Sequence, residues 1–279
     1  MFDGGIPTDI GSLHKLELLD LGGNNLIGTI PSTVGNLSSY RLHNLERLYL
    51  PGNQLEGNLP SYFSNSSKLI QLDFGFNLLT RPIPATSLGK LNNLRYLALQ
   101  GNQPTGEPEN PELNFLTDLS NCRSLETLVL HNNPLNGHIP RSIGSLKGLT
   151  FIELSSNNLT GTIPSIVGGL ERLRRFHVDD NKIEGLIPKE LCSLQQLGEI
   201  SFRNNEITGL IPDCISNLSL LQKLVLNANR LNSSIPVTLW DLENLLFLNL
   251  SSNFLSASLP ASMRKSSVIE NVDLSRNQI

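Results

Sequence analysis

The sequence is poor in charge, cysteine and aromatic residues. Charged side chains make up 16% of the 279 residues, cysteine occurs 3 times and tryptophan once, whereas an average globular domain has about 25% charged residues. Three cysteines provide neither a disulfide framework nor the ligand spacing of a metal site. The net charge of -4 lacks the basic excess expected of a nucleic-acid-binding face, so no nucleic acid is expected as a partner.

Long apolar runs and catalytic signatures are also missing. No stretch approaches the roughly 18 apolar residues of a membrane helix, so we expect no membrane contact within this segment. The first residues, Met1–Gly5, lack the basic region and apolar core of a signal peptide. The motifs G-x-S-x-G, H-E-x-x-H, C-x-x-C, G-x-G-x-x-G and G-x-x-x-x-G-K-[ST] do not occur. We therefore expect neither a cofactor nor an enzyme activity of this segment.

Leucine and asparagine are abundant instead, with 55 and 31 copies, and they recur in a repeat. The unit is L-x-x-L-x-L-x-x-N-x-L-x-G-x-I-P, and one clean copy runs from Leu149 to Pro164. Its asparagine returns after 29, 24, 25 and 31 residues and then in six steps of 24. The landmark asparagines are Asn24, Asn53, Asn77, Asn102, Asn133, Asn157, Asn181, Asn205, Asn229, Asn253 and Asn277. This periodicity predicts a solenoid of about eleven repeats.

Each place in the unit has a physical reason. The alternation in L-x-L predicts a short strand with one buried face, and stacked units then form a parallel inner sheet. The asparagine amide can pair the backbone groups of the turn that follows the strand. The glycine suits a turn with a positive φ, and the proline fixes φ for entry into a short helical or 3-10 turn on the outer side. The sequence therefore predicts an α/β repeat solenoid.

The pattern is irregular in two places, near residues 37–44 and 103–118, where we expect loops that leave the solenoid. Arg81, Ser233 and Ala257 replace the turn glycine. None of these breaks divides residues 1–279 into two domains. Gly4-Gly5-Ile6-Pro7 is the second half of a unit, and Ile279 stands in the middle of another. We therefore expect a single repeat domain that is truncated at both ends.

The cysteines and the glycosylation sequons bear on the compartment. Cys122 replaces an inward leucine and is expected to be buried. Cys192 and Cys214 lie in consecutive units on the outer side, where a disulfide between them is as well supported as two free thiols. Asn249 is expected to project from an inner strand. Six N-x-S/T sequons fit a secreted, glycosylated surface; they begin at Asn36, Asn65, Asn158, Asn217, Asn232 and Asn249.

The unit Asn-x-Leu-x-Gly-x-Ile-Pro resembles the plant-specific class of extracellular leucine-rich repeats over nearly the whole chain. Residues 111–122, P-E-L-N-F-L-T-D-L-S-N-C, are similar to an irregular unit of plant receptor-like serine/threonine kinases allied to the flagellin-sensing and bacterial-blight-resistance receptors. The resemblance implies the ligand-binding ectodomain of a single-pass plasma-membrane protein, on its apoplastic side. It also implies a peptide or protein ligand and a co-receptor kinase as partners.

A ligand would lie across the variable residues that flank the strand leucines on the concave face. The densest patch, an aromatic ring beside charges of both signs, suits a mixed peptide; it comprises Phe151, Glu153, Arg175, His177, Asp179, Asp180, Glu199 and Arg203. The alternative is that these residues only pair with their neighbours, Glu153, Arg175 and Glu199 forming a charge ladder. A second, more aromatic patch comprises Tyr49, Gln71, Asp73, Phe76 and Tyr96.

Three functions remain open. The first is ligand recognition by a receptor ectodomain in immune or developmental signalling. The second is a soluble leucine-rich-repeat inhibitor of a cell-wall-degrading enzyme, and the third is a truncated or decoy remnant of a receptor gene.

Overall fold

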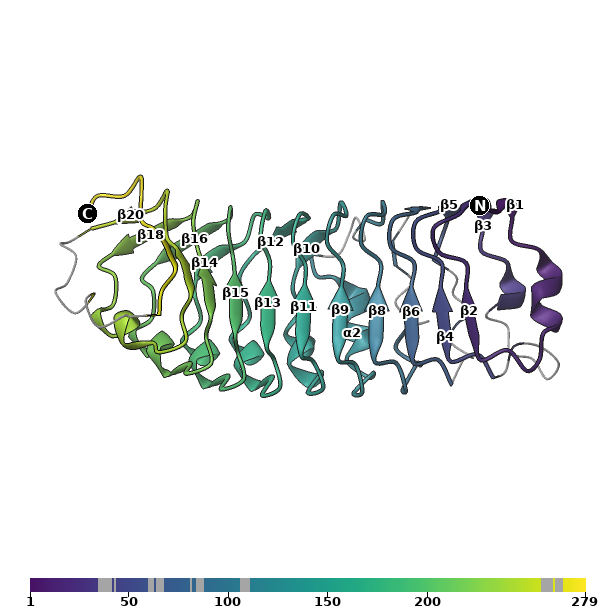
Figure 1. Ribbon diagram of the computed structural model, residues 1–279, viewed down its shortest axis with the longest axis horizontal. Coiled ribbons are helices and arrows are strands. Elements are labelled where there is room, and N and C mark those ends of the chain that lie inside the picture. The colour runs from purple at the N-terminus through teal and green to yellow at the C-terminus, as the bar shows by residue number, and fades with distance from the viewer. Residues whose placement is uncertain are drawn as a thin grey trace.

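The structure, a computed structural model, is an elongated stack of coils with the N-terminus at one end and the C-terminus at the other (Figure 1). It describes residues 1–34, 42, 44–59, 63, 68–80, 82–83, 88–105, 111–256, 263 and 268–279. The coils bury one continuous apolar cluster, which extends from Ile6 to Leu255. Within the described ranges, no helix combines the length and apolarity needed to cross a bilayer.

Eleven parallel strands form one sheet along the whole stack, which confirms the predicted inner sheet and the number of repeats. Each strand is three residues long, and its middle residue stays in register with the middle residue of the next strand, as in Ile152 beside Phe176 and Ile200. The strands are β2 (Leu18–Asp20), β4 (Arg47–Tyr49), β6 (Gln71–Asp73), β8 (Tyr96–Ala98), β9 (Thr127–Val129), β11 (Phe151–Glu153), β13 (Arg175–His177), β15 (Glu199–Ser201), β17 (Lys223–Val225), β19 (Phe247–Asn249) and β21 (Asn271–Asp273).

The asparagine after each strand pairs backbone groups of two coils, as predicted. Asn205 is typical: its Nδ2 donates to Phe202 O in its own coil and to Val178 O in the preceding coil, at 3.2 and 2.9 Å. Its Oδ1 accepts from the buried Ile183 N–H at 3.0 Å. The same contacts recur from coil to coil, and we call this series of side chains the asparagine ladder.

A second set of short strands follows the ladder on the flank of the coils. The turn glycine gives these strands their bend: Gly161 has φ 71°, and Ser233, which replaces it, keeps φ 76° instead of relaxing. The flank strands are β1 (Asp3–Gly5), β3 (Asn25–Thr29), β5 (Gln54–Gly57), β7 (Leu78–Leu79), β10 (Asn136–His138), β12 (Asn158–Thr160), β14 (Glu184–Leu186), β16 (Glu206–Gly209), β18 (Arg230–Ser233) and β20 (Phe254–Leu255).

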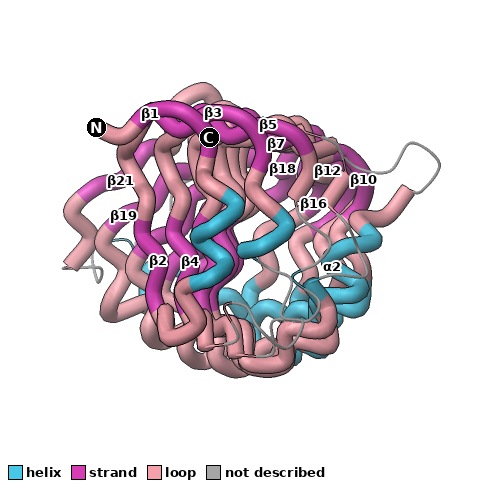
Figure 2. The backbone as a smooth tube through the Cα atoms, turned by 90° about the vertical axis from the view of Figure 1, so that its right-hand side faces the viewer, coloured by secondary structure: helices cyan, strands magenta, loops and turns pink. Residues whose placement is uncertain are grey.

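Short 3-10 helices lie across the coils from the long sheet, on the outer side (Figure 2). A proline stands immediately before each of the 3-10 helices named below; Pro164, for example, has φ -68° and precedes η5. This agrees with the predicted role of the proline. The 3-10 helices are η1 (Thr8–Ser12), η2 (Ser32–Val34), η4 (Arg141–Ser145), η5 (Ser165–Gly169), η6 (Lys189–Ser193), η7 (Asp213–Asn217) and η8 (Val237–Asp241).

The structure corrects the loop predicted at residues 103–118. Residues 114–118 of the predicted loop belong to an α-helix, α2 (Asn114–Leu119). Phe115, Leu116 and Leu119 are buried in the core, at 4%, 0% and 0% exposure, and this helical spacing of apolar residues was hidden by the prolines and acidic residues before it. Residues 106–110 lie outside the described residues, as does most of the other predicted loop at 37–44.

The cysteines lie where the repeat alignment placed them. Cys192 on η6 and Cys214 on η7 form a disulfide, with their Cα atoms 5.6 Å apart. Cys122 is a free, fully buried cysteine, and burial raises the pKa of its thiol to about 11. The Cys122 side chain therefore acts as an apolar filler of the core.

Candidate ligand-binding inner face

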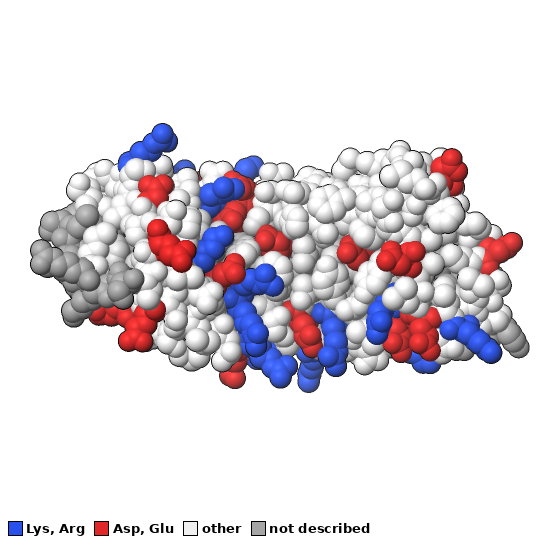
Figure 3. Space-filling view, viewed as in Figure 1, with Lys and Arg blue, Asp and Glu red and all other residues white. Residues whose placement is uncertain are grey.

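The exposed surface of the eleven-stranded sheet is the candidate site, and we call it the inner face. Because side chains alternate along a strand, the first and third residues of each strand project onto it. The middle residue is buried in all of these strands except β21, where Val272 is 37% exposed. Residues that follow the next buried position, such as Asp179 and Asp180 after Val178, continue this surface. Charged side chains are concentrated over β11 to β15, beside a largely uncharged stretch (Figure 3).

The eight predicted ligand-binding residues do come together. Phe151, Arg175 and Glu199 are register neighbours on β11, β13 and β15, and Glu153 pairs with His177 in the same way. Asp179, Asp180 and Arg203 lie at the ends of the same coils and contact one another. We call these eight residues the charged patch.

The pairing within the charged patch differs from the predicted charge ladder. His177, not Arg175, lies between the two glutamates: its Nδ1 is 3.0 Å from Glu153 Oε2, and its Nε2 is 3.3 Å from Glu199 Oε2. Only the contact with Glu153 has hydrogen-bond geometry. Arg175 instead stacks on the Phe151 ring, with its guanidinium carbon 4.2 Å from the ring centroid. An arginine can do this because its planar cation is attracted to the face of an aromatic ring.

The carboxylates of the charged patch are held by neighbouring groups. Burial tends to raise the pKa of Glu153, but hydrogen bonds from His177 and Ser155 outweigh it, and the pKa is lowered. Burial dominates at Asp179 and raises its pKa, although the Ser201 hydroxyl donates to both carboxylate oxygens at 2.8 Å.

Asp180 pairs with the Arg203 guanidinium at 2.5 Å. The residues of the charged patch therefore do pair with their neighbours, as the alternative to ligand binding stated. Its role in binding stays a prediction, and a ligand there would have to exchange contacts with these pairs.

The second patch lies on β4, β6 and β8 and in the coil end after β6. The Tyr49 hydroxyl donates to Gln71 Oε1, and Asp73 Oδ1 accepts from Gly75 N at 2.9 Å. Phe76 is 54% exposed. Its ring packs edge to face against the His131 ring, with the two ring centroids 6.4 Å apart. This patch is thus aromatic and acidic.

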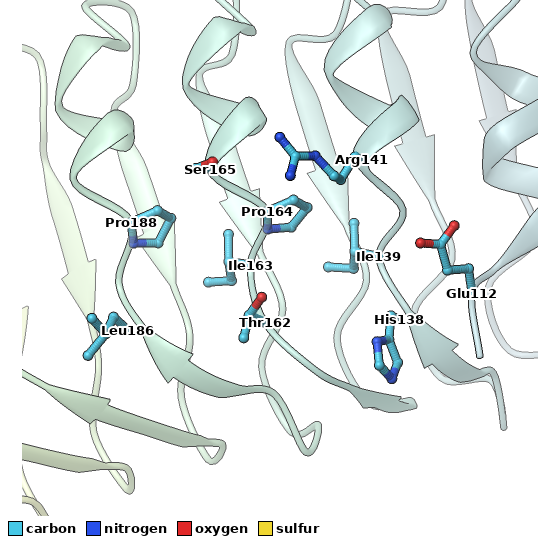
Figure 4. A pocket seen from close by; sticks show the side chains of 10 residues that line it. All are labelled: Glu112, His138, Ile139, Arg141, Thr162, Ile163, Pro164, Ser165, Leu186 and Pro188. Atoms are coloured by element: carbon cyan, nitrogen blue, oxygen red, sulfur yellow. The ribbon is translucent and has the colours of Figure 1, made fainter.

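A groove of about 440 Å³ on the flank was not predicted (Figure 4). Glu112 and Arg141 stand at one end and Leu186 and Pro188 at the other, with Ile163 and Pro164 between them. The signal in the sequence was the recurrence of the Ile-Pro dipeptide, whose neighbouring residues come together when consecutive coils stack. The groove is lined by apolar side chains and by the charged Glu112 and Arg141. No group of three His, Cys, Asp or Glu side chains in the described part of the chain could hold a metal ion.

Comparison with known families identifies the repeat. One leucine-rich-repeat model matches residues 43–103 and 171–231, and a second matches residues 15–37, 124–146 and 148–170. The chain belongs to the leucine-rich-repeat family.

Curated relatives of this leucine-rich-repeat chain are plant receptors. Receptor-like protein 39 of Arabidopsis thaliana is 29% identical over 146 residues, which are 52% of this chain and 15% of that protein. A probable leucine-rich-repeat receptor-like serine/threonine-protein kinase of the same plant is 42% identical over 60 residues, or 22% of this chain and 6% of the kinase. The chain thus matches only a small part of the length of these relatives.

Solved leucine-rich-repeat structures match nearly the whole chain. The plant peptide hormone receptor RGFR1, solved in complex with RGF2, has a TM-score of 0.92 and 36% identity, over 99% of this chain and 42% of that one. The Arabidopsis receptor kinase HAESA, in complex with the peptide hormone IDA and the co-receptor SERK1, has a TM-score of 0.87 and 32% identity, over 99% and 44%. The fold is therefore that of a plant-type leucine-rich-repeat receptor ectodomain.

The predicted sequons of the leucine-rich-repeat chain differ in exposure. Asn158, Asn217 and Asn232 are exposed on the flank strands and η7. Asn249 is half-buried at the end of β19 on the inner face, as predicted, and its Oδ1 accepts from Ser251 N at 3.0 Å. Asn36 and Asn65 lie outside the described residues. Glycosylation of these sites stays a prediction.

Proposed function

We propose that this chain is a ligand-recognition segment of a plant receptor ectodomain, facing the extracellular space, and that it binds a peptide or protein ligand on its inner face. The observation that carries the proposal is the match of 99% of the chain, at 32–36% identity, to receptors solved with peptide hormones. The inner face supplies what such a ligand needs, because the coils repeat while the side chains on the strands vary.

The proposal extends to partners and to the rest of the protein. HAESA was solved with the co-receptor SERK1, and we infer that a co-receptor kinase is also a partner of the parent receptor of this chain. The 42% identity with a receptor-like serine/threonine kinase supports a kinase of this kind as the parent protein, while the narrower group is proposed on the resemblance of residues 111–122. A kinase domain would then lie elsewhere in the parent protein, and the present segment would act by binding and not by catalysis.

The test is direct binding of ligands to the secreted protein. The protein is produced by secretion, immobilised, and screened by biolayer interferometry against synthetic plant and microbial peptides. Binding is then repeated with Arg175→Ala and with the matched control Lys223→Ala. The control removes a cation that occupies the equivalent strand position on β17 and lies 5.8 Å from the Phe247 ring.

A peptide that binds the native protein and the control but not Arg175→Ala would support recognition by the charged patch. If Arg175→Ala binds as tightly as the native protein and the control, Arg175 does not contribute to recognition, which contradicts the role proposed for the charged patch. Inhibition of a fungal polygalacturonase, in the absence of any peptide binding, would favour the soluble inhibitor instead.

A further inference from the structure

The second patch is built around one carboxylate, that of Asp73. Asp73 is the third residue of β6, half-buried, with Tyr49 on β4 as its register neighbour. Its carboxylate accepts a hydrogen bond from the backbone Gly75 N–H. In the part of the chain that the structure describes, Asp73 forms no ion pair, whereas Glu153 and Asp180 of the charged patch both contact a basic side chain.

An unpaired acceptor lies beside this carboxylate. Gln100 is only 9% exposed, and its Oε1 has no hydrogen-bond partner among the residues that the structure describes. Its amide group lies directly against Gly75, where any Cβ would collide with it. Gly75 is the residue whose N–H Asp73 accepts, so the Gln100 amide and the Asp73 carboxylate flank the same turn. A buried acceptor without a donor is destabilising, and an incoming donor would relieve it.

Aromatic rings border the same place. Tyr96 on β8 is the register neighbour of Gln71 on β6, to which the Tyr49 hydroxyl donates. Burial raises the pKa of Tyr96, and Coulombic repulsion from Asp73 and Tyr49 raises it further. This repulsion acts because both side chains lie near Tyr96. The pKa of Asp73 is also raised, mainly by burial and in addition by Asp20. Within the described ranges, the negative charge of Asp73 thus lacks both full hydration and a counter-ion.

We propose that Tyr49, Asp73, Tyr96 and Gln100 form a subsite of the inner face that binds an arginine side chain of the ligand. The guanidinium group has five donors in one plane and stacks on aromatic rings. It can donate to the Asp73 carboxylate while its plane lies against a tyrosine ring, and it pairs the buried Gln100 Oε1 when the Gln100 amide turns toward the ligand. This inference rests on the proposed function, because it names the kind of residue that a peptide ligand would place there.

The chain itself provides the variants for a test. In Asp73→Asn the charge is lost but the turn can be kept, because Asn249 occupies the same position on β19 and its Oδ1 accepts from Ser251 N at 3.0 Å. Asp273→Asn is the matched control. Asp273 is the third residue of β21 and accepts from Ser275 N at 3.0 Å, but no tyrosine precedes it on β17 or β19.

The probes are acetyl-arginine methylamide and acetyl-citrulline methylamide, which share a shape and differ in charge. Saturation-transfer NMR measures their binding to the whole chain, and circular dichroism confirms that each variant is folded. We expect the arginine probe to bind the native protein and Asp273→Asn equally. We expect about tenfold weaker binding to Asp73→Asn, which corresponds to about 1.4 kcal/mol, and little binding of the citrulline probe to any of them.

Equal binding of the arginine probe to native protein and folded Asp73→Asn would overturn the proposal, as would equal binding of both probes. The result is separable from that of the peptide screen, since the probes need no natural ligand. Arg175-dependent peptide binding without binding of the arginine probe would remove the subsite and leave the receptor function standing. Asp73-dependent binding of the arginine probe, with no peptide ligand found in the screen, would support the subsite and leave the receptor function without support.

Discussion

Replacing Asn157 by alanine measures how much one member of the asparagine ladder stabilises the stack. Asn157 is 8% exposed. Its Oδ1 accepts from Leu135 N at 3.3 Å, and its Nδ2 donates to Leu130 O and Leu154 O at 3.1 and 2.9 Å. The substitution therefore removes hydrogen bonds both within a coil and between two coils.

The two carbonyl groups keep a partner after the substitution, which limits the loss. Leu130 O still accepts from Asn133 at 2.7 Å, and Leu154 O from Asn181 at 3.0 Å. The Leu135 N–H, which donates to Asn157 Oδ1, is left unpaired in the core. An orphaned buried donor costs about 1–3 kcal/mol and each lost bond about 0.5–1.5 kcal/mol. We therefore expect the free energy of unfolding to fall by about 2–6 kcal/mol.

The next residue provides the control. Asn158 is exposed on β12, and in enzymatically deglycosylated protein Asn158→Ala should change the free energy of unfolding by less than about 0.5 kcal/mol. Urea denaturation followed by far-UV circular dichroism compares the two variants at an unchanged m-value. If Asn157→Ala loses no more stability than Asn158→Ala, the stabilising role assigned to the ladder is wrong.

Three further outcomes follow from features of the coils. Replacing Cys192 and Cys214 together by alanine should lower the free energy of unfolding by about 3 kcal/mol, as expected for a loop closed at a sequence separation of 22, and reducing the native protein should shift its urea midpoint similarly. Cys122, with a pKa of about 11, should be about a thousandth ionised at pH 8 and react with a thiol reagent only after unfolding; rapid labelling of the folded protein would contradict its burial. Ser233→Gly should raise the thermal midpoint, by up to about 1 kcal/mol in stability, because Ser233 has φ 76°; a lowered midpoint would show that its hydroxyl matters more than its backbone.

The sequence predicted the fold almost completely because every coil satisfies the same local requirements. Leu154 must be inward, Asn157 must pair the turn and Gly161 must take a positive φ, and each requirement leaves a mark at a fixed place in the repeat. The helix α2 escaped prediction because it occurs once. A single irregular unit has no second copy to align with, and its flanking prolines indicated a loop.

The inner face was predicted less completely. The repeat register is enough to place Phe151, Arg175 and Glu199 side by side, and the structure does so. The repeat register does not determine which rotamer each side chain adopts. Whether Arg175 meets a glutamate or the Phe151 ring depends on rotamers and on the competing imidazole of His177, and these are determined by packing in three coils at once.

The asparagine ladder also separates the spacing of the inner face from the length of the coils. The bond from one ladder asparagine to the equivalent carbonyl of the preceding coil spans 27 residues at Asn229, where Phe202 O accepts, and 32 and 34 residues at Asn53 and Asn133. Its length stays between 2.8 and 3.2 Å throughout. The extra residues are thus absorbed away from the strands, so insertions can reshape the outer side while a ligand on the inner face still meets rungs at a constant interval.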